Sequence, residues 1–387
     1  MPSFSHDPLS PKDAADVVIV GVAARGLAAA ARRAGLRALV LDLFGDDDTR
    51  ELALAAIPLR RIGAFAIDPA DLYEQLAIHA GPDIPVVLGT GFEHQPEVVE
   101  RLAARFRLVG NGPPTLAWTK EPLMLARLLH NLGIPHPQVF ADHAPAGMRT
   151  LEKRIGGSGG WHVKPASESR GWGWYLQEEL QGRTVSALFL GNGHKARLLA
   201  FSEQWCEPSE DAPYRYGGAA GPIRLDPSIE ASIASALDAV VNAAGIVGLA
   251  SADLMLTGDG WSLIEINPRP GASLDVFDHE PLPPLLRLHF EACRGELPDL
   301  ALLTPEAAGM VRGAGVFYAP FSFEMRLDPL PDWVADRPPQ GTRIETGEPI
   351  CTLFAAGRDV REVRDTLARR RDQLWRDLSM ASRKAAE

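Results

Sequence analysis

The sequence predicts a mixed α and β protein that begins with a parallel α/β unit and continues with antiparallel strands. Three observations carry this prediction. A strand-helix-strand pattern starts at residue 16, two apolar strands flank a Gly-Asp-Gly turn near residue 259, and short strands separated by turn residues follow residue 311. Tight turns join antiparallel strands, whereas parallel strands require a crossover such as a helix.

The first unit is expected to contain a strand over residues 17–20, a helix over 25–34 and a strand over 38–43. Both strands are almost continuously apolar, which is typical of a parallel sheet covered on both faces. Gly21 and Gly26 invite comparison with a dinucleotide-binding turn, but the three-glycine spacing is absent. We therefore expect a structural α/β domain here, and a nicotinamide-dependent oxidoreductase is disfavoured.

Length and composition place the chain among globular proteins of two or three packed units. It has 387 residues, of which 46% are hydrophobic and 23% charged. A net charge of −11 argues against nucleic acid as the main partner, because phosphate binding requires a basic face. No uncharged apolar run is long enough to span a bilayer, so we expect no membrane partner.

Cysteine usage and the first residues predict a cytoplasmic protein. Cys206, Cys293 and Cys351 are widely spaced, so they form neither a zinc pattern nor an even set for disulfides. Single buried thiols are usual in a reducing compartment. The first eight residues lack the basic and apolar regions of a signal peptide.

Residues 249–269 carry the strongest chemical signal. Two apolar strands flank Gly258-Asp259-Gly260, and a loop symmetric about Asp259 sets Asp253 directly opposite Glu265. Asn267 lies on the same face as the two acids because side chains alternate along a strand. The same register sets two further pairs opposite each other, Leu254 with Ile264 and Leu256 with Ser262.

Two carboxylates opposed across a sheet repel each other, so we expect a cation between them. Carboxylate and amide oxygens suit Mg²⁺, with Mn²⁺ as an alternative. The apolar alternates predict that the other face is buried, which favours a metal site over a solvated edge. We therefore predict Asp253, Glu265 and Asn267 as metal ligands. The Arg269 guanidinium is suited to a phosphate or an anionic intermediate.

The run Glu265-Ile266-Asn267-Pro268-Arg269-Pro270, after a strand that carries an acid, resembles the metal-binding end of the ATP-grasp superfamily. With residues 271–275 it is similar to predicted ATP-dependent carboligases related to biotin carboxylase. The resemblance implies an ATP-grasp fold with an N-terminal doubly wound α/β domain and a small C-terminal β lobe. It also implies ATP and Mg²⁺ as cofactors and places Arg269, as a catalytic residue, near the transferred phosphate.

A lysine at residue 120 fits the same resemblance. We expect Thr119-Lys120-Glu121 to open a helix that ends near Gly133, with Thr119 as the N-cap. A lysine at the positive end of a helix dipole is unfavourable unless an anion binds there. The resemblance assigns Lys120 to the ATP phosphates, and the alternative is a surface lysine.

Residues 152–164 are expected to form a strand, a glycine-rich loop and a return strand. The resemblance identifies the loop as the mobile flap that closes over the nucleotide. It places Lys153 at the phosphates or the adenine, and we count Lys153 with Arg269 as catalytic. It places Ser158, Gly159 and Gly160 over the β- and γ-phosphates.

The adenine-binding hinge is expected over residues 174–186. The resemblance places Gln177 or Glu178 at the edge of the adenine ring. The usual ribose-binding acid, two residues after the hinge glycine, is replaced by Thr184. Glu178 or Glu179 is the alternative ribose ligand.

Two further loops are substrate candidates. Residues 214–222 are aromatic, basic and glycine-rich, and Arg215 with Gly217 and Gly218 can bind a carboxylate through its guanidinium and backbone amides. The alternative is a tight structural turn. A strand over 85–89 leads into Gly89-Thr90-Gly91-Phe92-Glu93, at the type of strand end where α/β sheets bind ligands. Glu93 is therefore a substrate candidate, with a solvated loop acid as the alternative.

These features predict four divisions of the chain. Residues 1–15 are expected to be disordered, 16–112 to form the N-terminal domain, 113–300 the ATP-grasp domain and 301–387 the C-terminal β lobe with a terminal helix. The flap subdomain covers about 135–182 and the metal-binding subdomain about 183–300. Helices are expected over 229–244, 285–293 and 363–378.

The function predicted from these residues and the resemblance is ATP-dependent ligation of a carboxylate to an amine through an acyl phosphate. Small molecules are the expected partners, and a homodimer is among the assemblies to test. Similar carboligases occur in one-carbon cofactor biosynthesis, where glutamate is joined to tyrosine or tyramine units. The alternatives are a biotin-carboxylase-like enzyme that activates bicarbonate and a nucleotide sensor that binds ATP without turnover.

Overall fold

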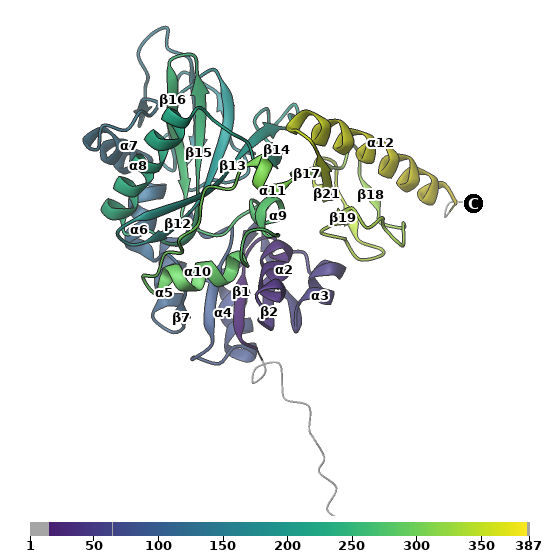
Figure 1. Cartoon of the computed structure of the whole chain (residues 1–387). Helices are drawn as coiled ribbons and strands as arrows, with labels where there is room; N and C mark the ends of the chain where they lie inside the picture. Colours follow the sequence, from purple (N-terminus) through teal and green to yellow (C-terminus); the bar gives the residue numbers. More distant parts are fainter. Residues whose placement is uncertain (1–14, 64, 385–387) are drawn as a thin grey trace, which may run out of the picture.

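The computed structural model describes residues 15–63 and 65–384, and Figure 1 shows their arrangement. The segment predicted to be disordered, residues 1–15, therefore lies outside the described residues except for Ala15. Across the described ranges, no helix combines the length and the apolar character needed to cross a bilayer.

A five-stranded parallel sheet forms the N-terminal part of the chain, in the order β3-β2-β1-β6-β7. Its central strands are fully buried because helices cover both faces, as their apolar sequence predicts. The strands are β1 (Val17–Val20), β2 (Ala38–Asp42), β3 (Ala55–Pro58), β6 (Pro85–Leu88) and β7 (Arg107–Leu108). The helices are α2 (Arg25–Arg33), α3 (Asp47–Leu52), α4 (Pro69–His79) and α5 (Pro96–Ala103).

The strand order reverses between β1 and β6, so the loops after these two strands meet at the carboxyl edge of the sheet. The backbone N–H of Val22 donates to the carbonyl of Thr90 at 2.9 Å, which joins the two loops. Doubly wound sheets bind ligands in the crevice at such a reversal. Glu93 lies in the second of these loops, three residues beyond Thr90.

The two helices that follow, α6 (Pro113–Lys120) and α7 (Pro122–Asn131), correct one prediction. Lys120 ends α6 instead of opening a helix, and Glu121 caps α7 by accepting a hydrogen bond from the Met124 N–H at 2.6 Å. The break occurs because Pro122 favours extended backbone at Glu121 and suits the first turn of a helix. Thr119 is therefore not an N-cap, and Lys120 lies at the negative end of a helix dipole, where a cation is favourable.

A four-stranded antiparallel sheet follows, in the order β10-β9-β11-β8. Its central strand β9 leads into the glycine-rich loop, and the short strand β10 returns from it, as predicted from residues 152–164. The strands are β8 (Val139–Phe140), β9 (Thr150–Arg154), β10 (Lys164–Pro165) and β11 (Trp174–Glu178).

An eight-stranded antiparallel sheet forms the rest of the framework, in the order β16-β15-β12-β13-β14-β17-β21-β19. The strands after residue 311 pair with β14, so they extend the sheet of the preceding segment. The strands are β12 (Arg183–Asn192), β13 (Ala196–Cys206), β14 (Tyr216–Gly221), β15 (Val247–Thr257), β16 (Gly260–Asn267), β17 (Val311–Tyr318), β19 (Val334–Ala335) and β21 (Pro349–Gly357).

Helices cover this large sheet on both faces. Helix α8 (Pro227–Ala244) packs its buried aliphatic residues on one face, and α10 (Leu285–Cys293) packs between the other face and the N-terminal sheet. Figure 1 shows α10 between the two sheets and α12 (Val360–Lys384) along the C-terminal strands. The remaining short elements are β4 (Arg61–Ile62), β5 (Ala66–Ile67), α9 (Leu274–Phe277), α11 (Pro305–Ala308), β18 (Phe323–Glu324) and β20 (Arg343–Ile344). The predicted fold class is confirmed.

The hairpin of β15 and β16 has the predicted acid pair but a different register near its turn. Asp253 faces Glu265, whereas Leu254 faces Leu263 and Leu256 faces Trp261. The predicted pairs of Leu254 with Ile264 and Leu256 with Ser262 are therefore wrong. The turn has two residues between Thr257 and Gly260, and a bulge beside Asp253 restores the register at the acids.

Candidate functional site

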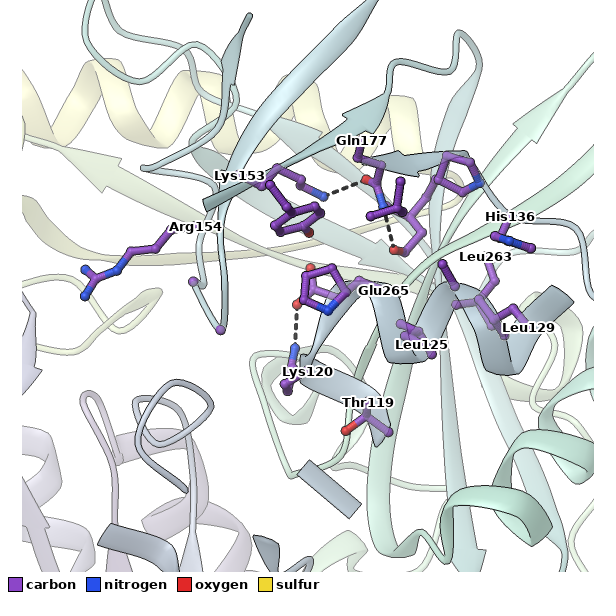
Figure 2. A pocket seen from close by; sticks show the side chains of 18 of the residues that line it. Thr119, Lys120, Leu125, Leu129, His136, Lys153, Arg154, Gln177, Leu263 and Glu265 are labelled. Atoms are coloured by element: carbon purple, nitrogen blue, oxygen red, sulfur yellow. Dashed lines mark hydrogen bonds and ion pairs between the residues drawn. The ribbon is translucent and has the colours of Figure 1, made fainter. Parts of the chain in front are cut away.

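A pocket lies between helices α6 and α7, the sheet that carries the glycine-rich loop, and strand β16. Figure 2 shows Lys120 and Glu265 at one end of it and Lys153 with Gln177 across it. Four charged or polar side chains from separate parts of the chain thus meet in one place. The aliphatic residues and prolines that line the pocket are Pro122, Leu125, Ala126, Leu129, Pro137, Val139, Leu263 and Ile264.

The charged end of the pocket joins Lys120 to the predicted metal ligands. The Lys120 ammonium donates to Oε1 of Glu265 at 2.5 Å and to Oδ1 of Asn267 at 2.7 Å. The Asn267 amide nitrogen donates in turn to Oδ2 of Asp253 at 3.1 Å. The three predicted ligands therefore lie side by side, with the lysine as their cation.

The electrostatics of this group fit a further cation. Burial, together with the neighbouring Glu265 carboxylate, raises the pKa of Asp253. Burial also opposes ionisation of Glu265, but the ammonium groups of Lys120 and Lys153 outweigh it and lower the pKa of that carboxyl. Among the described residues, no three His, Cys, Asp or Glu side chains are grouped to hold a metal ion, so the candidate site depends on the Asn267 amide as its third member.

Lys153 lies on β9, almost fully buried, and donates to Oε1 of Gln177 on β11 at 2.9 Å. Burial lowers the pKa of the Lys153 ammonium. The Gln177 amide nitrogen donates to the carbonyl of Ile264 at 3.3 Å. Ile264 is the extra residue of the β16 bulge, so its carbonyl is available for this contact.

Arg269 lies beyond the end of β16 and pairs with Glu93 of the N-terminal loop. Its Nε donates to Oε1 of Glu93 at 2.5 Å, and Oε2 of Glu93 accepts from the Gly91 N–H at 2.7 Å. Although Glu93 is buried, the positive charges of Arg269 and Lys120 lower its pKa to about 2. Glu93 is therefore an ionised partner of the arginine, and the solvated-acid alternative is wrong.

A family model of the ATP-grasp domain matches residues 120–273. The match begins at Lys120 and includes Lys153, Glu265 and Arg269. Over residues 120–273 the chain is similar to the ATP-grasp domain.

A curated protein and solved structures are also similar to this chain. The carbamoyl phosphate synthase large chain of Rubrobacter xylanophilus is 27% identical over 258 residues, which cover 60% of this chain and 24% of the relative. This chain thus spans about a quarter of the length of the curated relative that it matches.

Two solved structures resemble almost the whole chain. L-Amino acid ligase from Bacillus licheniformis has a TM-score of 0.65 at 14% identity, over 92% of this chain and 96% of the ligase. The biotin carboxylase domain dimer of Hydrogenobacter thermophilus 2-oxoglutarate carboxylase, solved with MgADP, ADP and bicarbonate, has a TM-score of 0.64 at 12% identity, over 89% and 86% of the two chains. At these identities the comparison shows a shared fold.

The start of the glycine-rich loop lines the pocket. Gly156 and Gly157 line the pocket, whereas Ser158, Gly159 and Gly160 do not. The Gly159 carbonyl accepts from the Tyr216 N–H at 2.9 Å, which ties the end of the loop to β14. These contacts place the loop against the large sheet.

His162, at the end of the same loop, also lines the pocket. Its Nδ1 accepts from the Arg154 N–H at 3.0 Å. Burial and the nearby Lys153 charge lower the pKa of His162 to about 4, so the ring is neutral near pH 7.

The acids of the hinge lie outside the pocket. Glu178 accepts from the Gln138 N–H at 3.1 Å, and Glu179 pairs with Arg149 at 2.6 Å and accepts from the Tyr214 hydroxyl at 2.9 Å. Only Gln177 of the three predicted hinge residues lines the pocket. Both acids are engaged in holding the hinge to neighbouring segments.

The segment over residues 214–222 is largely strand β14 and not a loop, which corrects a second prediction. Gly217 and Gly218 lie in the sheet beside Trp205, where a Cβ atom would come within 2.8 and 2.5 Å of the indole. The Arg215 guanidinium donates to the carbonyls of Glu207 and Gly347 and lies 3.7 Å from the centre of the Tyr318 ring. We therefore do not include these three residues in the substrate site.

Sequence reasoning missed most of the apolar wall of the pocket. Tyr175 precedes Gln177 by two residues on β11, so strand alternation is a signal that identifies it. Leu263 stands in the same relation to Glu265 on β16. His136 and Val139 carry no comparable signal, because they follow a helix and face the pocket only in the folded chain.

Proposed function

We propose that this chain is an ATP-dependent carboxylate-amine ligase that forms an amide through an acyl phosphate and releases ADP and phosphate. The observation that carries the proposal is the convergence of Lys120, Lys153, Glu265 and Gln177 on one pocket with an apolar wall. Buried ammonium groups suit the triphosphate, and the wall suits a flat base. The similarity to L-amino acid ligase over nearly its whole length supports this proposal.

Within this proposal the adenine lies against Leu125, Leu129 and Leu263, and Gln177 with the Ile264 backbone recognises its edge. Lys153 and Lys120 hold the phosphates. The flap, through Gly156 and Gly157, covers the nucleotide and excludes water, which matters because an acyl phosphate hydrolyses readily.

Asp253, Glu265 and Asn267 are the residues that would hold Mg²⁺, or Mn²⁺ in its place. When bound, the cation neutralises charge on the transferring phosphoryl group. Lys120 occupies the oxygens of Glu265 and Asn267 at 2.5 and 2.7 Å, so its ammonium must turn toward the phosphates when these oxygens bind the metal. The MgADP in the 2-oxoglutarate carboxylase structure supports this assignment.

Arg269 holds the group that receives the phosphoryl. Its Nε is anchored by the ionised Glu93, so the outer edge of the guanidinium keeps one orientation toward the site. The substrate carboxylate attacks the γ-phosphorus, ADP leaves, and the amine then displaces phosphate from the acyl carbon.

Finer assignments are part of the same proposal. The partners are a small-molecule carboxylate and a small-molecule amine. Glutamate, used in cofactor biosynthesis, is one candidate for either substrate. The proposed compartment is the cytoplasm. A homodimer is consistent with the dimeric carboxylase domain. The bicarbonate in that structure keeps a bicarbonate-activating enzyme as the second candidate function.

ADP release from Mg-ATP tests the proposal, measured with single carboxylates, amines, their pairs and bicarbonate. We expect a carboxylate-amine pair to stimulate release and Glu265→Gln to abolish it, while Glu100→Gln, an exposed change on α5, leaves it unchanged. Stimulation by bicarbonate alone would support the carboxylase instead. ATP binding without stimulation by any addition would indicate a nucleotide sensor.

A further inference from the structure

A second pocket lies where the N-terminal sheet meets the segment after β16. Leu88 and Leu108, at the carboxyl ends of β6 and β7, line one side of it. Phe92, Val99 and Leu116 add further apolar surface. Arg269 also lines this pocket.

The polar groups of this second pocket are almost all engaged with one another. Asn111 bonds to the backbone of Val247 and Pro268, and both ring nitrogens of His289 bond to backbone groups. Both oxygens of Glu93 are also occupied.

The exception is the pair of terminal nitrogens, Nη1 and Nη2, of the Arg269 guanidinium. Its Nη2 has no hydrogen-bond partner within the described part of the chain, and its Nη1 has only the Pro270 carbonyl at 3.5 Å. The second pocket therefore offers an apolar space with a single unsatisfied cationic group at its border.

We propose that the second pocket binds the carboxylate substrate, and that this substrate is a carboxylic acid with an apolar body. Its carboxylate meets Arg269, and its aliphatic or aromatic group lies among Leu88, Phe92 and Leu108. This inference rests on the proposed ligase function and names the substrate class of that site.

The position along β16 supports this arrangement. Glu265 lines the first pocket and Arg269 the second, so one continuous segment carries the charged residues of both. The chain turns between them, because the Arg269 N–H donates to the Asn267 carbonyl at 2.9 Å. A carboxylate held at Arg269 thus lies next to the end of the strand that carries Glu265 and Asn267.

The positive charge of Arg269 favours binding of the carboxylate substrate in the second pocket over binding of the amine substrate. A guanidinium attracts a carboxylate and repels an ammonium group, and the charge of Glu93 is already paired with Arg269. The apolar lining also disfavours glutamate, because its second carboxylate would be buried without a partner. Bicarbonate would leave the apolar space unfilled.

Hydroxylamine trapping identifies the acid without knowledge of the natural amine. In the reaction the acid and ATP form an acyl phosphate and ADP. Hydroxylamine nitrogen then attacks the acyl carbon, phosphate leaves with the C–O electron pair, and the nitrogen loses a proton to give a hydroxamate. We expect kcat/KM to rise about fourfold for each methylene group from acetate to hexanoate, and phenylacetate to react well.

A substitution that fills part of the second pocket, compared with the same change elsewhere, tests where the apolar group of the acid binds. Leu108→Phe adds volume to the second pocket on the short edge strand β7, and Leu54→Phe makes the same change at a site 41% exposed and outside both pockets. We expect Leu108→Phe to lower kcat/KM for hexanoate at least tenfold and for acetate less than twofold. Leu54→Phe should leave both unchanged, and thermal unfolding of each variant reports whether it folds.

The outcomes separate the inference from the function on which it rests. If glutamate supports ADP release and the apolar acids do not, the ligase function stands and the inference is overturned. Stimulation by bicarbonate alone overturns both the inference and the ligase function. An equal loss for acetate and hexanoate in folded Leu108→Phe would also overturn it. If no acid in the series yields hydroxamate or ADP, the proposed function itself fails.

Discussion

Nζ of Lys120 lies 2.5 Å from Oε1 of Glu265, although 145 residues separate them in the sequence. The lysine side chain is almost fully buried, and the glutamate side chain is 30% exposed. The ammonium therefore contacts the same oxygens that the predicted metal requires. Lysine and metal are expected to compete for them.

Replacing Lys120 tests this competition. Lys120→Met leaves Glu265 and Asp253 without their nearest cation, which should lower the free energy of unfolding by about 1–3 kcal/mol. Added Mg²⁺ then relieves the repulsion between the two acids. We expect Mg²⁺ to raise the melting temperature of Lys120→Met more than that of the wild type. Equal shifts in the two proteins would show that the lysine and the metal use different sites.

Lys153 should govern nucleotide affinity. Lys153→Met removes a buried ammonium group that donates to Gln177, and loss of a charged hydrogen bond to phosphate costs about 1.5–3 kcal/mol. Equilibrium dialysis should therefore show ATP binding weakened by about 10- to 150-fold. Lys164→Met, on β10 and outside the pocket, is the matched control and should bind ATP as the wild type does.

Glu93 is predicted to act by positioning Arg269. Glu93→Gln removes the ionised partner of the guanidinium, so the arginine loses its fixed orientation while the nucleotide pocket is unchanged. We expect kcat for ADP release to fall by about 10- to 100-fold with KM for ATP within twofold of the wild type. A rise in KM for ATP at unchanged kcat would assign Glu93 to nucleotide binding instead.

Because of His289, we expect the folded protein to lose stability in weak acid. Its ring is fully buried, with Nδ1 accepting from the Leu249 N–H at 2.9 Å and Nε2 lying 3.0 Å from the Val109 carbonyl. Only the neutral ring satisfies both contacts, and burial lowers the pKa of His289 from 6.5 to about 4.

The sign of this effect follows from proton binding. Between pH 6.5 and about 4 the unfolded chain binds a proton that the folded chain does not, so stability falls as the pH is lowered through this range. The loss amounts to about 2 kcal/mol at pH 5. Urea unfolding at pH 7.5 and 5 measures it, and His289→Gln should reduce the difference between the two pH values. An undiminished difference would assign the acid sensitivity to other groups.

Local sequence predicted the acid pair of the hairpin and the strands on either side of the flap. Alternation along β15 and β16 placed Asp253 opposite Glu265, because strand periodicity and a short turn act over neighbouring residues. The same reasoning missed the bulge at Ile264, whose carbonyl contacts Gln177 from another sheet. It also missed the break at Glu121, where Pro122 outweighed the helical pattern around it.

The sequence by itself determined the parallel N-terminal unit, the acidic hairpin and the glycine-rich flap, because each depends on residue types at short and regular spacing. The tertiary structure alone decided that Lys120 reaches Glu265, that Glu93 holds Arg269, and that Arg215 is occupied by backbone carbonyls. Residues 100 or more positions apart meet only when sheets and helices pack, and no local pattern records which side chain will face which.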